Sequence, residues 1–167
     1  MKNRIIINTL TAAASLGLLL AAADASAFSS GRIRSVNASG GFTASAFRAN
    51  QGPSGGGYFH SRRATTDGSG NATVNRGTTF SGPNGESGSR YGNNAYNADG
   101  SASHSSGFSA SGNRGSLETS GSASRSADGT VQQSRNTTVT NASTGNTVNV
   151  SESYTKGSGV TRTVTPQ

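Results

Sequence analysis

Residues 147–165, TVNVSESYTKGSGVTRTVT, hold the clearest structural pattern in the chain. Apolar side chains alternate there with Thr, Asn and Ser on both sides of a short Gly-rich segment at 156–159. Alternation with a period of two around a short Gly loop is typical of a β-hairpin. The pattern predicts two strands with one thin apolar face and one hydroxyl face. The residues that we expect to form the sheet-packing face are Val148, Val150, Tyr154, Val160 and Val164.

A third strand is predicted just before this hairpin. Residues 130–140 place Val131 and Val139 on one face, with polar residues between them. Three consecutive strands joined by short turns favour an antiparallel meander. Between residues 85 and 126 the strand pattern is weaker, because Ser, Gly and Ala replace Val and Thr. The clearest strands therefore lie in 130–165.

Turn signals recur about every fifteen residues from residue 64 onwards. Asp-Gly and Asn-Gly dipeptides favour tight hairpin turns, because both residue types accept a positive φ. These dipeptides lie at residues 67–68, 84–85, 99–100 and 128–129, and related Gly-containing turn signals lie at 113–115, 144–146 and 157–159. This spacing predicts a degenerate β-repeat region over 64–167, with a unit of about 30 residues that contains two strands and two turns. A β-hairpin array or a solenoid-like stack would both fit it.

The composition excludes several classes of protein. Ser, Gly, Thr and Asn make up 87 of the 167 residues, or 52%, and there is no Cys or Trp. After residue 27, Val, Phe, Leu and Ile together number 16 of 140 residues. Because this is about half of what a packed core needs, we exclude a helical bundle, an α/β enzyme and a multi-pass membrane protein. The absence of Cys excludes a disulfide-stapled toxin.

The N-terminal segment predicts export. Lys2 and Arg4 precede an apolar run over residues 5–23, and Ala25-Ser26-Ala27 forms an A-x-A cleavage site. This order is typical of a signal peptide over residues 1–27. The alternative is an uncleaved membrane anchor, but polar residues interrupt the run and no basic cluster follows it. We expect a bacterial periplasmic or extracellular protein with no membrane span after cleavage.

Residues 28–63 are predicted to form a largely disordered arm. Five aromatic residues are spread there among Gly and Ser, and residues 51–57 (QGPSGGG) are a pure loop signal. The mature chain has a net charge of +6, and Arg supplies eleven of its twelve basic side chains. Because guanidinium groups suit phosphate and carboxylate, the arm is a candidate for contacts with polyanions or a cell surface. The candidate contact residues are Arg32, Arg34, Arg48, Arg62 and Arg63.

No motif for catalysis, cofactor binding or metal binding is recognisable in the sequence. His60 and His104 have no acidic partner near them in sequence. The segment 67–78 begins like a calcium loop but has Ala72 where Gly is needed and Thr78 where Glu is needed. We therefore predict no enzyme activity, no cofactor and no metal. No nucleic-acid-binding module is recognisable, so sequence-specific nucleic-acid recognition is not expected.

Three functions agree with these observations. The first is a secreted, non-catalytic structural or adhesive protein of a bacterial cell surface or matrix, which self-associates through β-strands. The second is a largely disordered basic polypeptide that binds polyanions such as extracellular DNA or acidic polysaccharide. The third is a small periplasmic β-protein that folds as a monomer.

Overall fold

The computed structural model describes residues 27–167 and consists of β-strands and turns. Each strand is 8 to 11 residues long. The strands are β1 (Ala27–Val36), β2 (Phe42–Gln51), β3 (Gly57–Thr66), β4 (Ala72–Ser81), β5 (Ser87–Tyr96), β6 (Ala102–Gly112), β7 (Gly115–Arg125), β8 (Val131–Asn141), β9 (Thr147–Thr155) and β10 (Gly159–Pro166).

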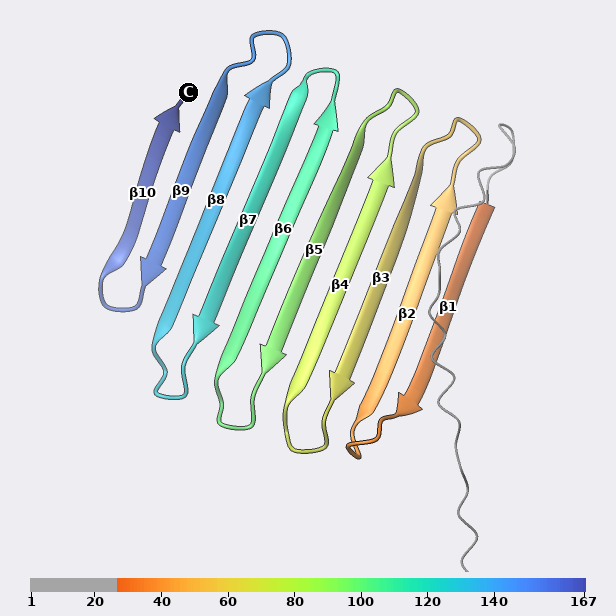
Figure 1. Ribbon diagram of the computed structural model, residues 1–167, viewed down its shortest axis with the longest axis vertical. Helices are drawn as coiled ribbons and strands as arrows, with labels where there is room; N and C mark the ends of the chain where they lie inside the picture. Colours follow the sequence, from red (N-terminus) through yellow and green to blue (C-terminus); the bar gives the residue numbers. More distant parts are fainter. Residues whose placement is uncertain (1–26) are drawn as a thin grey trace, which may run out of the picture.

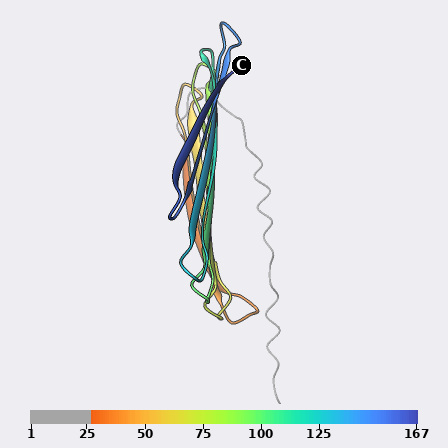
Figure 2. The same cartoon turned by 90° about the vertical axis from the view of Figure 1, so that its left-hand side faces the viewer.

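The ten strands form one antiparallel sheet in strict chain order (Figure 1). Every strand pairs with its neighbour in sequence, and β1 and β10 form the two edges. Seen edge-on, the sheet is a single thin layer with no second layer against either face (Figure 2). Within residues 27–167 there is no helix that is long and apolar enough to cross a membrane.

One turn geometry connects most of the strands. In the five-residue turns the first residue donates its backbone N–H to the carbonyl of the fifth, as Asn97 does to Ser101 at 3.0 Å. The N–H of the fourth residue, Gly100, returns to the carbonyl of Asn97 at 3.0 Å, and Gly100 has a φ of +83°. A type I turn followed by a left-handed residue favours Gly at that place. The fourth position of six turns is a positive-φ glycine: Gly40, Gly55, Gly70, Gly85, Gly100 and Gly129.

The constant turn length gives the sheet a regular spacing. Strands β1 to β6 begin at residues 27, 42, 57, 72, 87 and 102, so each begins fifteen residues after the last. The ladders contain no shift in register along these strands. Residues thirty positions apart therefore lie in the same row across the sheet, two strands apart.

The prediction of a mostly β antiparallel meander is confirmed. The strands predicted at 130–140, 147–155 and 160–165 correspond to β8, β9 and β10. The predicted disordered arm is wrong over residues 28–63, which form β1, β2 and most of β3. Turns at 37–41 and 52–56 bring these strands into the same ladder as the rest. The predicted signal peptide lies outside the described residues except for Ala27, which begins β1.

This sheet has no buried side-chain core in the part of the chain that the structure describes. Both faces of a single layer are open to solvent, so large apolar side chains remain exposed, including Val160 at 73% and Phe28 at 63%. Within a face, some aromatic rings lie over a cross-strand glycine. Tyr91 covers Gly107, for example, and a Cβ added at Gly107 would meet that ring.

Replacement of a turn glycine tests the importance of the turn geometry. Gly100→Ala forces an L-residue into a left-handed conformation, so we expect the free energy of unfolding to fall by about 1–2 kcal/mol. Chemical denaturation followed by circular dichroism measures this change. Gly92→Ala is the control, because Gly92 lies within β5 and a Cβ there would have only one contact, at 3.9 Å. Equal losses in the two variants would contradict the account.

Candidate binding face

The sheet separates its side chains by chemistry. Because successive residues of a strand point to opposite faces, the continuous ladders assign every strand residue to one of two faces. One face, which we call the arginine face, includes all eight valines and nine of the eleven arginines that follow residue 27. Its arginines are Arg32, Arg34, Arg48, Arg62, Arg76, Arg90, Arg125, Arg135 and Arg162.

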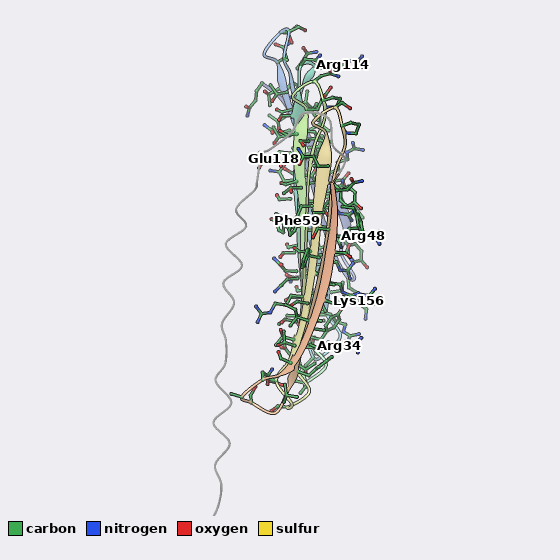
Figure 3. The ribbon with its side chains drawn as sticks, turned by 90° about the vertical axis from the view of Figure 1, so that its right-hand side faces the viewer. Arg34, Arg48, Phe59, Arg114, Glu118 and Lys156 are labelled. Atoms are coloured by element: carbon green, nitrogen blue, oxygen red, sulfur yellow. The ribbon has the colours of Figure 1, made fainter. Side chains whose placement is uncertain are left out.

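The opposite face, which we call the hydroxyl face, contains 29 of the 35 Ser and Thr residues in the ladders. Cross-strand partners there bond to each other, as Ser89 and Ser109 do at 2.9 Å and Ser122 and Ser134 do at 2.8 Å. Its large side chains are few and include Phe47 and Phe59, whose rings stack at 6.5 Å. Figure 3 shows Arg34 and Arg48 on one side of the layer and Phe59 and Glu118 on the other.

The predicted site residues divide between these faces. Arg32, Arg34, Arg48 and Arg62 lie on the arginine face, and Arg63 lies on the hydroxyl face. The predicted sheet-packing residues of β9 and β10 also lie together on the arginine face, with Val164 opposite Val150 and Val160 opposite Tyr154. Apart from Arg63, two groups of residues that the sequence placed in separate regions therefore share one continuous surface.

The arginine face has an ordered layout across β1 to β5. Arg32, Arg62 and Arg76 occupy one row across the middle of the strands, and Arg62 lies directly opposite Arg76. A second row, four residues away along each strand, contains three aromatic residues. These are Phe28, Tyr58 and Phe80, on the same three strands as the three arginines. The row between the two contains Arg48, His60 and Arg90.

Aromatic and cationic side chains of this face contact one another. The Arg48 guanidinium lies 5.6 Å from the centre of the Phe28 ring, which is a cation–π arrangement. Phe80 and Phe108 stack with their ring centres 6.4 Å apart. Aromatic rings of this face remain open to solvent, since Tyr58 is 36% and Phe80 38% exposed.

Carboxylates are almost absent from the arginine face. Glu152 is the only one among its strand residues, and it pairs with Arg162 at 3.4 Å in β9 and β10. Glu118 lies on the hydroxyl face. The other acidic residues in 27–167 lie in turns, at Asp67, Glu86, Asp99 and Asp128. The six arginines of β1 to β5 on this face therefore have no carboxylate beside them on the same strands.

The turn carboxylates accept hydrogen bonds from other residues of their own turns. Hydrogen bonds from the Asn71 side chain and the Ser69 N–H hold the pKa of Asp67 below its usual value. The hydroxyl and backbone N–H of Ser101 do the same for the pKa of Asp99. Thr130 lowers the pKa of Asp128, chiefly through its backbone N–H. The pKa of Glu86 is lowered by its own backbone N–H and that of Asn84.

The two histidines have structural hydrogen bonds. His60 Nδ1 is 2.8 Å from Thr78 Oγ1, and His104 Nδ1 is 2.8 Å from Asn94 Oδ1; each partner lies directly opposite on an adjacent strand. Neither histidine is paired with a carboxylate. No group of three His, Cys or acidic residues that could hold a metal ion occurs among residues 27–167.

The arginine face is shallowly hollowed over its later strands. Small residues at Gly92, Ser106 and Gly121 continue the central row across β5 to β7. Larger side chains surround this low region and line the depression, among them Arg90, Phe108, Arg135 and Tyr154. The central row therefore has arginines on both sides of a shallow region of small residues.

Sequence reasoning missed the arginines outside the predicted arm. Arg76, Arg90, Arg125, Arg135 and Arg162 share the face but were not predicted as contact residues. The thirty-residue offset between Phe28 and Tyr58, and between Arg32 and Arg62, was a signal in the sequence that could have connected arm and sheet.

Comparisons with protein-family models, with curated proteins and with solved structures find no match.

Acidification tests the turn carboxylates. Their folded-state pKa values are lowered, so their stabilisation is complete above the unfolded value of about 4 and is lost as the pH falls through the folded value. We expect the free energy of unfolding to decrease as the pH is lowered from about 5 towards 2, measured by urea denaturation. A variant with Asp67→Asn, Asp99→Asn and Asp128→Asn should show a weaker pH dependence. An equally steep dependence in that variant would refute this role.

Proposed function

We propose that the chain is a non-catalytic structural or adhesive protein, exported by a bacterium to its surface or extracellular matrix, whose sheets stack on one another. The observation that supports this most is the single layer without a buried side chain. Ordering a residue costs about 1–2 kcal/mol of backbone entropy, and a sheet normally offsets this cost by burying at least one face. A second layer supplied by another copy would provide that burial.

The hydroxyl face is the face that suits stacking of identical copies. Its side chains are mostly Ser, Thr, Asn, Ala and Gly, so two such faces can approach closely and interdigitate. Its only charged strand residues are Arg63 and Glu118, which have opposite signs. Two arginine faces, by contrast, would bring rows of like charge together. Stacking through the hydroxyl face leaves the arginine face exposed on the outside of the assembly.

The edge strands argue against simple edge-to-edge growth. β1 contains Arg32 and Arg34, and β10 contains Arg162 and Pro166. Charged residues and proline on edge strands are common devices that prevent pairing with another sheet. In the register of the sheet, Arg162 of β10 and Arg32 of β1 occupy the same row, so edge pairing of two copies in that register would oppose two arginines.

A pair of neighbouring serines in β6 provides a sharp test. Ser105 lies on the hydroxyl face and Ser106 on the arginine face, and both are half-buried. We expect the purified protein to show a β-type circular dichroism spectrum and to increase in size with concentration on size-exclusion chromatography. Ser105→Lys should block this growth, because it places a charge in the stacked interface, whereas the control Ser106→Lys should permit it.

Three outcomes would contradict the proposal or its choice of stacking face. A protein that stays monomeric and melts cooperatively at every concentration would be a small self-sufficient β-protein. A random-coil spectrum would instead indicate a largely disordered basic polypeptide. Equal effects of the two lysine variants would show that stacking does not use the hydroxyl face.

A further inference from the structure

We infer that the arginine face of β1 to β5 binds single-stranded nucleic acid without sequence preference, with phosphates on its arginines and bases on its aromatic row. This inference concerns the face opposite to the one that we assign to stacking, so it does not depend on the proposed function. It requires only that the sheet forms.

The charge distribution gives the first reason. Six exposed arginines lie on this face within five consecutive strands, and no carboxylate lies among them. Arg62 and Arg76 are directly opposite each other, at the spacing of about 5 Å that separates neighbouring strands. Like charges so placed destabilise a sheet unless an anion lies between them. A chain of phosphates would supply anions along the whole row.

The aromatic row gives the second reason, and it selects among polyanions. Phe28, Tyr58 and Phe80 lie in one row with their rings at least one-third exposed. Exposed aromatic rings beside a basic track are the usual means of holding single strands, because every base has a face that can stack. Double-stranded DNA would leave this row unused, since its bases are already stacked.

The spacing of the rows fits this chemistry. Residues of one face are separated by about 7 Å along a strand, so Arg48 and Arg90 lie about 7 Å from the aromatic row and Arg62 and Arg76 about 14 Å from it. Arginine side chains extend several ångströms and can reach towards a backbone that runs between these rows. A strand laid across β1 to β5 would then have its bases on the aromatic side.

Adjacent residues on opposite faces provide matched variants. Arg62 lies on the arginine face and Arg63 on the hydroxyl face, and both are exposed. The probe is a fluorescein-labelled oligothymidylate of 20 nucleotides, and fluorescence anisotropy at 50 mM salt gives its dissociation constant with the purified protein. Arg62→Gln should weaken binding by about fivefold and lower the slope of log affinity against log salt by about 0.7. Arg63→Gln changes the net charge by the same amount and should leave both the dissociation constant and the salt slope within twofold of their original values.

The aromatic contribution has its own matched pair. Tyr58 lies in the aromatic row, and Phe59 lies on the hydroxyl face, where it stacks on Phe47. Tyr58→Ser should weaken binding of the oligothymidylate by at least fivefold. Phe59→Ser should not weaken it, provided that circular dichroism shows the sheet intact in both variants. Tyr58→Leu, which retains apolar bulk but cannot stack equally well, serves as a second variant if Tyr58→Ser unfolds.

The remaining outcomes overturn the inference. Equal losses for Arg62→Gln and Arg63→Gln would show attraction by net charge alone. If Arg62→Gln weakens oligothymidylate binding but neither Tyr58 variant does, the bases do not stack on the aromatic row. A polyuronate that competes with the oligothymidylate at equal charge concentration would assign the face to acidic polysaccharide instead. Failure to bind any of these probes would leave the stacking proposal unaffected.

Discussion

The backbone hydrogen-bond ladder is the interaction on which the rest of this structure depends. In most domains a packed core fixes the positions of the strands, but here no side chain is buried in the described sheet. A protein hydrogen bond contributes only about 1 kcal/mol net, which is comparable with the entropy lost by each ordered residue. The short turns and the cross-strand bonds between hydroxyls, as between Thr140 and Thr147 at 3.0 Å, therefore matter more than in a protein with a core. The same weakness is the physical basis of our proposal that another copy covers one face of the sheet.

Constant strand and turn lengths convert this ladder into two chemically distinct faces. Because β1 to β6 begin fifteen residues apart and side chains alternate between faces, two residues fifteen positions apart lie on opposite faces. Two residues thirty positions apart lie on the same face. Phe28 and Tyr58 share a row for this reason, as do Arg32 and Arg62. A single inserted residue within β2 would move Arg62 and every later arginine relative to Arg32 unless a bulge absorbed it. The layout of the arginine face thus follows from the regularity of the chain.

Sequence reasoning located the strands wherever β-branched residues alternate with polar ones. Residues 147–155 were predicted with the bounds that β9 has, because Val148, Val150 and Tyr154 alternate there with Thr, Asn and Ser. Residues 28–63 were assigned to a disordered arm for two physical reasons. Their turns lack an Asp-Gly or Asn-Gly pair, and their arginine face mixes cations with aromatics, so that no simple apolar–polar alternation appears. Four of the five predicted contact arginines lie on one face, but only the register of β2 against β3 shows that Arg63 points away from the others.

The most direct test of this account is amide hydrogen exchange across the purified chain, because the central claim is that β1 to β3 belong to the same sheet as β8 to β10. The account predicts slow exchange in ten segments separated by fast-exchanging turns, with protection over residues 42–51 and 57–66 comparable to that over 131–141. Protection confined to residues 131–166, with rapid exchange throughout 28–66, would contradict the single sheet and with it the arginine face.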